Sequence, residues 1–294
     1  MLKPKGMSLI ICTKDREEAL QRCLQSLEKL HTPYTPLEIV LVDNRSTDGT
    51  SDVISQYKED SKWNVVSVFC NQIGLGNARN TGVENSNGEM LIFTDDDCLV
   101  EPNYFIQLCN QLEQYPADFG GGQILLVNED DDERIANMQF SDIKTLKPGV
   151  PYLRAGTIQG ANMFVRREVF DAIGGFNPQM GSGTPFSCED IEFMARANSH
   201  EYIGRLFPSL IVHHDHRRRR GSAAAKTIVK SYQYGKGAYL ASLLLRGYPA
   251  PFKVWRSRME TQNKKDYLQS LENEMRGAAD YIGLLTNRDT ELPN

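Results

Sequence analysis

The sequence has no long hydrophobic run and no excess of positive charge. The longest apolar stretch near its end, residues 238–245, is far too short to span a bilayer. The opening residues, Met1 to Gly6, contain no apolar segment of signal-peptide type. The formal net charge is −5, which provides no general attraction to nucleic acid or to an anionic membrane. We therefore expect a cytoplasmic protein without a transmembrane segment and without a nucleic-acid partner.

Cysteine pairs with the spacing of zinc sites or redox motifs are also missing. The six cysteines are scattered, and several lie inside apolar segments, where a thiol behaves as a small hydrophobic side chain. This distribution favours a reducing compartment. The apolar content of 40% and the charged content of 24% are ordinary for a soluble globular protein. The length of 294 residues suits one large domain, or one domain with an appendage.

Strand and helix patterns alternate through the first hundred residues. Four apolar runs predict strands, at residues 7–13, 37–42, 63–70 and 89–95. Helical patterns with short connections separate them, which predicts an α/β fold with a parallel, doubly wound sheet. Polar residues end three of these runs, at Thr13, Asp43 and Asp95. Because the carboxyl ends of parallel strands meet at one edge of a sheet, we expect these side chains to converge there.

The later part of the chain is less regular. We expect helices at residues 102–115, 166–173 and 187–197, and strands at 119–127, 160–165, 202–207 and 210–212. Residues 128–151 are weakly patterned and acidic at their start, so we interpret them as a loop or lid. From Ser222 the pattern becomes helical. We place a boundary near Arg220, between a main domain of residues 1–220 and a helical extension of residues 221–294.

Three consecutive carboxylates, Asp95 to Asp97, follow the apolar run 91–93. Adjacent negative charges repel one another, so a positive charge has to stabilise them. Side chains alternate along an extended segment, which would direct Asp95 and Asp97 to one side and Asp96 to the other. Carboxylate pairs of this kind hold hard divalent cations. A solvated acidic turn is the alternative, but two carboxylates on one face directly after a buried strand favour the metal.

Taken together, these segments resemble the family 2 glycosyltransferases of GT-A fold over roughly residues 8–214. Four matches occur in the right order, at residues 10–16 (IICTKDR), 42–49 (VDNRSTDG), 74–82 (GLGNARNTG) and 95–97 (DDD). Four more follow, at residues 160–167, 174–176, 189–190 and 212–214. An Asp-x-Asp sequence alone is common, but the ordered set is specific. The resemblance implies a Rossmann-like mixed, mainly parallel sheet flanked by helices, and inverting transfer of a sugar from a nucleotide-diphosphate donor to a hydroxyl acceptor.

The resemblance also implies a donor site, made of Thr13, Arg16, Asp43, Arg79, Asp95 and Asp96. In it, Asp43 would accept a hydrogen bond from the base, typically uracil, and Asp95 would reach the ribose. The alternative for Asp43 is a turn or N-cap role next to residues 46–48. The alternative for Arg79 is an ion pair with an acid on its own helix. Gly74 and Gly76 permit close approach of a ligand, which favours the donor role of Arg79.

A divalent metal, Mn²⁺ or Mg²⁺, is a further implication of the resemblance. Asp97 would be one ligand, and a histidine after the late strand would be another. Imidazole suits Mn²⁺ better than Mg²⁺. We prefer His213 to His214 as the ligand, because it directly follows the apolar strand 210–212. A histidine that faces solvent in a polar cluster is the alternative for each of them.

Direct inversion requires one base that takes the proton of the acceptor hydroxyl. By resemblance Asp190 occupies the position of this base, and Glu189 would bind the acceptor or support Asp190. The competing interpretation is a capping box, because Ser187 precedes Asp190 by three residues and acids favour a helix N-terminus. The glycine-rich residues 181–185, which could close over a donor, favour the catalytic interpretation.

Two features lie outside the matched motifs. Arg217–Arg220 could bind phosphate or an anionic membrane surface at the inner face, although most charge runs are solvated. The helical residues after Ser222 could cover the acceptor side, form a homo-oligomer contact, or only pack against the main domain. The chain also lacks the Gln-x-x-Arg-Trp motif and the membrane helices of processive synthases in this family, which implies a non-processive enzyme of polysaccharide or glycan biosynthesis.

Two competing functions remain at this point. A sugar-nucleotide nucleotidyltransferase would share the fold and an acidic metal site, but it should have a glycine-rich loop after the first strand, and residues 12–16 contain no glycine. A degenerate family member that acts as a binding or scaffold subunit should have lost the aspartates or the base. Neither is lost here, so we favour the enzyme.

Overall fold

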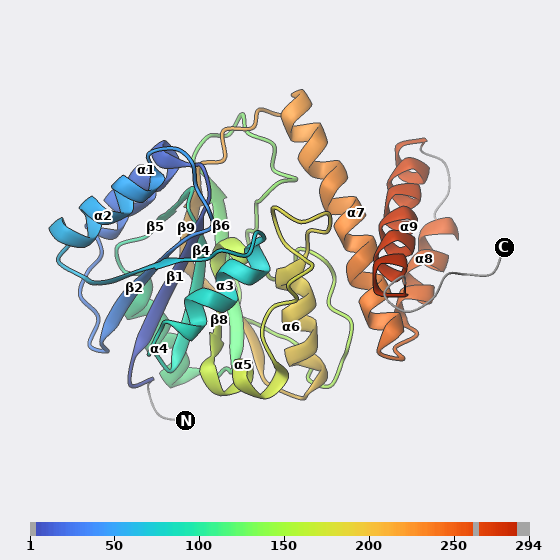
Figure 1. The fold of residues 1–294 in the computed structure, drawn as a ribbon. Coiled ribbons are helices and arrows are strands. Elements are labelled where there is room, and N and C mark those ends of the chain that lie inside the picture. The colour runs from blue at the N-terminus through green and yellow to red at the C-terminus, as the bar shows by residue number, and fades with distance from the viewer. Residues whose placement is uncertain (1–3, 261–264, 287–294) are drawn as a thin grey trace.

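The computed structural model describes residues 4–260 and 265–286 (Figure 1). Within these residues a mixed sheet of nine strands is flanked by helices, with the strand order β3-β2-β1-β4-β8-β6-β9-β5 and β7 paired with β9. The strands are β1 (Met7–Thr13), β2 (Leu37–Asp43), β3 (Asn64–Phe69), β4 (Met90–Asp95), β5 (Cys98–Val100), β6 (Phe119–Leu126), β7 (Lys144–Thr145), β8 (Met163–Arg166) and β9 (Gly204–His214). The expected α/β class with a mixed, mainly parallel sheet is confirmed.

Helices cover both faces of this sheet. They are α1 (Glu17–Leu27), α2 (Thr50–Asp60), α3 (Leu75–Glu84), α4 (Tyr104–Gln114), α5 (Arg167–Ile173), α6 (Glu189–Ser199), α7 (Ala223–Leu245), α8 (Ala250–Glu260) and α9 (Lys265–Thr286). Buried side chains of α1, α2 and α4 share one core with the sheet. Those of α3, α5, α6 and α7 share a second core on the opposite face.

The parallel part of the sheet aligns the strand ends that the sequence predicts. All seven residues of β2 are buried, as expected for a central parallel strand covered on both faces. In the register of β1, Thr13 lies opposite Asp43 on one side, and Cys12 lies opposite Asp95 on the other. The predicted convergence of Thr13, Asp43 and Asp95 at one edge is therefore confirmed.

The second half of the sheet differs from the expectation, and β5 and β7 are strands where none was expected. Residues 160–162 form a short 3₁₀ helix, η1 (Gly160–Asn162), and the strand begins only at Met163. The two expected short strands are one long strand, β9, whose pairing with β6 shifts between Gly122 and Gln123. Pro208 lies inside the skipped segment, and because proline has no N–H to donate, it interrupts the ladder without ending the strand.

The C-terminal extension is helical, as expected, and α7 joins it to the main body (Figure 1). The second half of α7 packs into the core of the main domain, and the Tyr239 hydroxyl donates to the Leu153 carbonyl at 2.8 Å. On its other side α7 contacts α9, with Gly237 against the Glu274 carbonyl and Gly277 against the Tyr234 carbonyl. The division at residue 220 stays a prediction. In the described part of the chain, every helix is too short or too polar to cross a membrane.

Candidate active site

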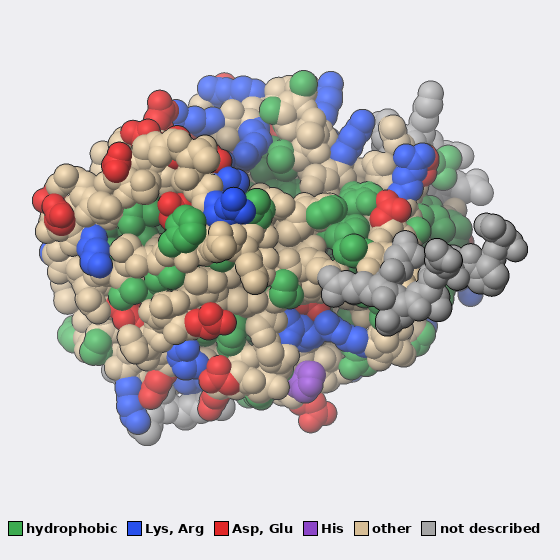
Figure 2. Space-filling view, viewed as in Figure 1, with side chains coloured by type: hydrophobic (Ala, Val, Ile, Leu, Met, Phe, Trp, Pro, Cys, Tyr) green, Lys and Arg blue, Asp and Glu red, His purple; other side chains and the backbone are tan. Residues whose placement is uncertain are grey.

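A cavity of about 700 Å³ opens where the parallel strands end. The ends of β1, β4 and β9 contribute to its floor, α6 begins at one wall, and the first half of α7 forms another. Figure 2 shows Lys and Arg side chains gathered along the upper part of the molecule, where α7 begins in Figure 1. Of the residues predicted for the site, Thr13, Arg16, Arg79, Asp95–Asp97, Glu189 and Asp190 all line this cavity.

Each of the three consecutive aspartates has a different positive or donor partner. Asp95 Oδ1 lies 3.4 Å from Arg79 Nη2, and Asp96 accepts a hydrogen bond from the Thr13 hydroxyl at 2.7 Å. Asp97 Oδ1 lies 2.8 Å from His214 Nε2, and Arg16 forms ion pairs with both Asp96 and Asp97. These partners explain how three adjacent carboxylates can be placed at a buried turn.

The surroundings shift the pKa of these groups in opposite directions. Burial raises the pKa of Asp96 to about 7, although Arg16 opposes the shift. Burial also acts on Asp97, but His214 and Arg16 hold the pKa of this carboxyl well below its usual range. In turn, Asp97 raises the pKa of His214 against the effect of burial. Asp97 and His214 thus form a charge-assisted pair.

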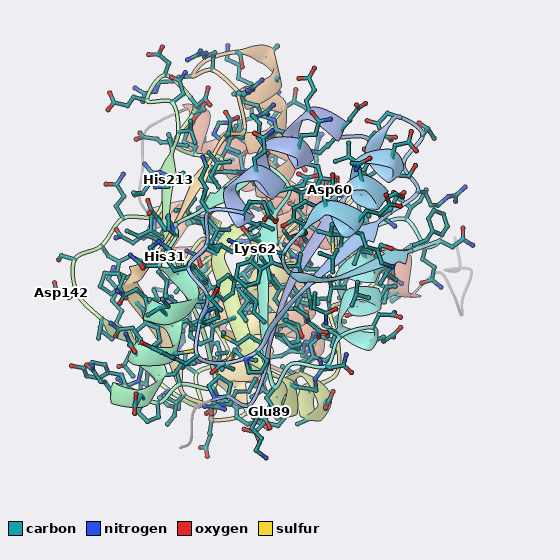
Figure 3. The ribbon with its side chains drawn as sticks, turned by 90° about the vertical axis from the view of Figure 1, so that its left-hand side faces the viewer. His31, Asp60, Lys62, Glu89, Asp142 and His213 are labelled. Atoms are coloured by element: carbon teal, nitrogen blue, oxygen red, sulfur yellow. The ribbon has the colours of Figure 1, made fainter. Side chains whose placement is uncertain are left out.

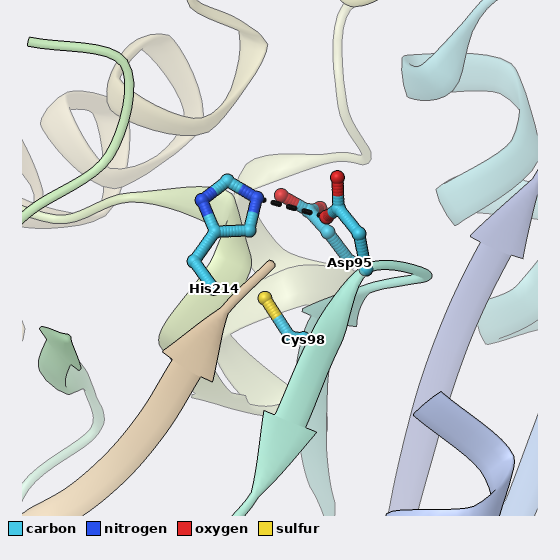
Figure 4. Close-up of side chains that lie close together, drawn as sticks. Asp95, Cys98 and His214 are labelled. Atoms are coloured by element: carbon cyan, nitrogen blue, oxygen red, sulfur yellow. Dashed lines mark hydrogen bonds and ion pairs between the residues drawn. The ribbon is translucent and has the colours of Figure 1, made fainter. Parts of the chain in front are cut away.

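Four side chains converge at the ends of β4, β5 and β9 with spacing suited to a metal ion. The ligand atoms of Asp95, Asp97, Cys98 and His214 all lie within 4.8 Å of one another, and Figure 4 shows three of them around one point. Carboxylate oxygen and imidazole nitrogen are ligands that fit Mn²⁺. Burial and Asp95 raise the pKa of the Cys98 thiol, and a thiol that keeps its proton is a poor ligand. The donor set therefore fits a divalent cation held by Asp95, Asp97 and His214.

The structure corrects the preference for His213. β9 extends through His214, and side chains alternate along it, so the two histidines lie on opposite sides of the strand. His213 Nε2 lies 2.7 Å from Glu101 Oε1, 34% of its side chain is exposed, and Figure 3 shows it near the surface. His214 is buried beside Asp97. The metal-binding role of either histidine stays a prediction, but the geometry supports only His214.

Asp43 has the local role that the sequence left as an alternative. Its Oδ1 accepts a hydrogen bond from the Ser46 backbone N–H at 2.8 Å, and its side chain does not line the cavity. The neighbouring Asn44 does line it, while its amide donates to the Cys70 and Gln72 carbonyls. A contact between Asp43 and a nucleotide base stays a prediction.

Arg79 connects two motifs that lie far apart in the sequence. It projects from α3 and is 2% exposed. Its Nη1 lies 2.5 Å from Glu189 Oε1 while its Nη2 faces Asp95, and its guanidinium stands over the Phe176 ring at 5.5 Å. The expected alternative, a pair within its own helix, is therefore wrong. A Cβ at Gly160 would collide with this guanidinium, which explains the glycine there.

Asp190 lies in the first turn of α6 with both carboxylate oxygens engaged. Oδ2 accepts from the Gly160 N–H at 2.8 Å and Oδ1 from the Ile191 N–H at 2.7 Å. Each oxygen keeps a second lone pair for another partner. The competing interpretation, a capping box at Ser187, is wrong, because the Ser187 hydroxyl donates to the Ser231 carbonyl of α7 instead.

Glu189 is almost completely enclosed. Burial raises the pKa of this carboxyl although Arg79 opposes the shift. The residue before it, Cys188, has a left-handed backbone with φ of 78°, a strained conformation for a side chain of this kind. Directly after this residue, Glu189 contacts Arg79 and Asp190 lines the cavity.

The sequence left open whether the C-terminal helices cover the site, and it assigned none of their residues to the site. Tyr232 and Lys236 of α7, Arg258 of α8, and Ser270 and Glu274 of α9 all line the cavity. The only signal in the sequence was the cluster of aromatic residues in α7, which did not distinguish a cavity wall from a packing face.

Known proteins resemble this chain in sequence. Residues 8–174 match the family model for glycosyl transferase family 2. Glycosyltransferase AglE of Haloferax volcanii is 26% identical over 231 residues, which are 79% of this chain and 72% of that protein. The poly(ribitol-phosphate) β-N-acetylglucosaminyltransferase TarS of Staphylococcus aureus is 33% identical over 111 residues, which are 38% of this chain but only 19% of TarS.

Solved structures resemble it in fold. TarS residues 1–349 in complex with UDP-GlcNAc superpose with a TM-score of 0.61 at 18% identity, over 96% of this chain and 82% of that one. The mannosyltransferase PcManGT from Pyrobaculum calidifontis, in complex with GDP-Man and Mn²⁺, gives a TM-score of 0.61 at 15% identity, over 98% of this chain and 89% of that one. The fold is thus that of GT-A enzymes, and the chain belongs to glycosyl transferase family 2 as a glycosyltransferase.

Proposed function

We propose that this enzyme is a metal-dependent, inverting and non-processive glycosyltransferase that moves one sugar from a nucleotide-diphosphate donor to a hydroxyl acceptor. The observation that carries the proposal is the arrangement of the cavity. Asp95, Asp97 and His214 converge at its floor, and Asp190 lines it from the first turn of α6. A cation site and a potential base thus share one cavity, as direct displacement of a diphosphate by a hydroxyl requires.

The donor is the first element of the proposal. TarS has been solved with UDP-GlcNAc and PcManGT with GDP-Man, so the shared fold accommodates either nucleotide. We propose a UDP-sugar, with the nucleotide near Thr13, Arg16, Arg79 and Asn44 and with Asp43 as the acceptor of a hydrogen bond from the base. Asn44 supports this placement, because it lines the cavity directly after the end of β2.

The cation site is the second element. Asp95, Asp97 and His214 would hold Mn²⁺ or Mg²⁺, and the bound ion would supply electrostatic stabilisation of the diphosphate leaving group. Arg16 balances the charge of Asp96 and Asp97 from the other side. The chain's own part is to orient these ligands: His214 by its place in β9, and Asp95 through its contact with Arg79.

The base is the third element. The hydroxyl oxygen of the acceptor bonds to the anomeric carbon as the bond from that carbon to the diphosphate breaks, and Asp190 takes the hydroxyl proton. Attack from the side opposite the leaving group inverts the anomeric centre. The two backbone hydrogen bonds from Gly160 and Ile191 hold the carboxylate in one orientation, so little reorganisation is needed. Glu189 acts by holding Arg79 and thereby Asp95.

Location and assembly stay predictions. We propose a cytoplasmic enzyme of glycan or polysaccharide biosynthesis that contacts the inner membrane face at most peripherally. Within Arg217–Arg220, Arg217 pairs with Asp215 and Arg219 with Asp130, which weakens the case for a free basic patch. We also propose a homo-oligomer contact through the C-terminal helices.

A thermal-shift experiment tests the proposed function. The melting temperature is measured with UDP-glucose, UDP-N-acetylglucosamine, UDP-galactose and GDP-mannose, each with Mn²⁺ and with a chelator. A donor at a hundred times its Kd should stabilise the fold by about 2.7 kcal/mol, and only with metal. Asp97→Asn should remove this shift, whereas Asp142→Asn, at an exposed loop position, should keep it.

The outcomes separate the alternatives. A shift with GDP-mannose alone would keep the transferase and reject the uracil assignment. No shift with any donor, in protein shown to be folded, would make the scaffold subunit the leading interpretation.

A further inference from the structure

The cavity extends beyond the region that a donor and a metal would occupy, because the C-terminal helices add a second polar wall. One face of α7 presents Ile228, Tyr232 and Lys236 at intervals of four residues, and all three line the cavity. These residues are about 6 Å apart along the helix axis for each step of four. The face therefore leads from the catalytic carboxylates toward α9 in steps of about one sugar ring.

Tyr232 lies in the middle of this face and beside the start of α6, where its carbonyl accepts a hydrogen bond from the Cys188 thiol at 3.9 Å. The residue is 38% exposed, so one side of it remains open in a wall of the cavity. Burial, and to a lesser extent the charges of Asp95 and Asp190, raises the pKa of the Tyr232 hydroxyl. An open aromatic ring beside a potential base is a platform on which the apolar face of a sugar can stack.

Lys236 and Glu274 mark one end of this face. Glu274, in α9, is 1% exposed. Its Oε1 accepts from Lys236 Nζ at 3.0 Å and also pairs with Arg258, whose Nη2 donates to the Ser270 hydroxyl at 3.1 Å. Its Oε2 has no hydrogen-bond partner among the described residues. A buried carboxylate oxygen without a donor is costly, so a ligand that brings a donor is favoured at this point.

The chemistry of this pocket selects hydroxyl groups over phosphate. Glu274 can only accept hydrogen bonds when ionised, and a phosphate offers it charge repulsion rather than a donor. A sugar hydroxyl can donate to Glu274 and accept from Lys236 or Arg258 at the same time. We propose that Tyr232, Lys236, Arg258 and Glu274 form an acceptor subsite for a neutral saccharide, whose terminal hydroxyl is thereby presented to Asp190. The proposal rests on the proposed transferase function.

The test measures binding of neutral saccharides by saturation-transfer NMR, with the p-nitrophenyl β-glycosides of glucose, galactose, mannose and N-acetylglucosamine as probes. Wild-type protein should bind at least one of them. Glu274→Gln should weaken that binding about tenfold or more, because a charge-assisted hydrogen bond is lost. The matched control is Glu272→Gln, an exposed position on the same helix that pairs with Arg276 and should leave binding unchanged.

Whether Glu274→Gln weakens or tightens binding distinguishes a site for neutral saccharides from a site for anions. If the pocket binds an anion instead, Glu274→Gln should tighten binding of the probe glycerol 3-phosphate, because a negative charge is removed. That result, or the absence of binding for every neutral probe, would overturn the proposal.

A second pair of variants covers the case in which Glu274→Gln disturbs the helices. Tyr232→Ala should weaken saccharide binding, whereas Tyr232→Phe should keep it, because stacking needs only the ring. Equal binding by both would contradict the subsite. Thermal shifts with UDP-sugar and Mn²⁺ on the same proteins show whether the donor still binds. If it binds while no saccharide does, the acceptor subsite alone fails; if the donor does not bind wild-type protein, the transferase proposal fails.

Discussion

Arg79 Nη1 lies 2.5 Å from Glu189 Oε1, although 110 residues separate the two in the chain. Both side chains are buried, at 3% and 7% exposure, and the same guanidinium also reaches Asp95. The guanidinium of Arg79 therefore connects three segments: the helix after β3, the end of β4 and the first turn of α6. We infer that the cation site and the base keep their relative positions largely through Arg79.

Removal of Arg79 should be strongly destabilising. Arg79→Met leaves Glu189 and Asp95 without their main counter-charge in a buried setting, which typically costs about 3–5 kcal/mol. Adding Glu189→Gln to Arg79→Met should cost less than Glu189→Gln does alone, because the unpaired charge is removed. Urea unfolding of the wild type, both single variants and the double variant measures this coupling. The exposed pair Arg276 and Glu272 is the control, with a coupling of about 0.5 kcal/mol or less. Strict additivity at Arg79 and Glu189 would contradict the inference.

Asp190→Asn should separate chemistry from binding. The amide keeps the shape of the side chain but cannot take a proton, so the rate of sugar transfer should fall by about 10²- to 10⁴-fold. The thermal shift with UDP-sugar and Mn²⁺ should persist, because donor and metal contact other residues. Asp171→Asn in α5, at an exposed position, serves as the control and should leave the transfer rate unchanged. Unchanged turnover in Asp190→Asn would remove this residue from the mechanism.

The two histidines should behave differently toward metal. His214→Ala removes the imidazole beside Asp97, so Mn²⁺ should no longer increase the thermal shift given by UDP. His213→Ala removes a half-exposed side chain that pairs with Glu101 outside the cluster, so the Mn²⁺ effect should remain. Melting of both variants in chelator alone corrects for any general loss of stability. The reverse pattern would restore His213 as the ligand.

The contact between α7 and α9 should depend on Gly277. A Cβ at this position would collide with the Tyr234 carbonyl oxygen, so Gly277→Ala should destabilise the protein by about 1–3 kcal/mol. At Gly283, on the same helix, a Cβ would meet nothing within 4 Å. Gly283→Ala should therefore be neutral or stabilise by up to about 1 kcal/mol through helix propensity. Thermal melting of the pair measures the difference, and equal melting temperatures would show that the close helix contact does not form.

Much of the fold could be predicted because it follows from local patterns. The apolar runs that became β1, β2 and β4 each end in a polar residue, and parallel pairing then places those residues at one edge regardless of the rest of the chain. Asp95–Asp97 could be assigned to the site for the same reason. Asp190 and Glu189 were assigned by resemblance, and the structure brings both to the cavity wall.

Other features depended on where a strand ends or on contacts between distant segments. β9 continues two residues past the expected strand 210–212, and because strand side chains alternate with a period of two, His213 and His214 face opposite sides. The Ser187 hydroxyl does not cap α6, because it donates to the Ser231 carbonyl of α7 instead. Tyr232 and Glu274 line the same cavity only because α7 packs on α9. No short sequence pattern encodes this contact between the two helices. The sequence by itself thus determined the sheet edge and its carboxylates, whereas only the tertiary structure decided which histidine lies beside Asp97 and which helices line the cavity.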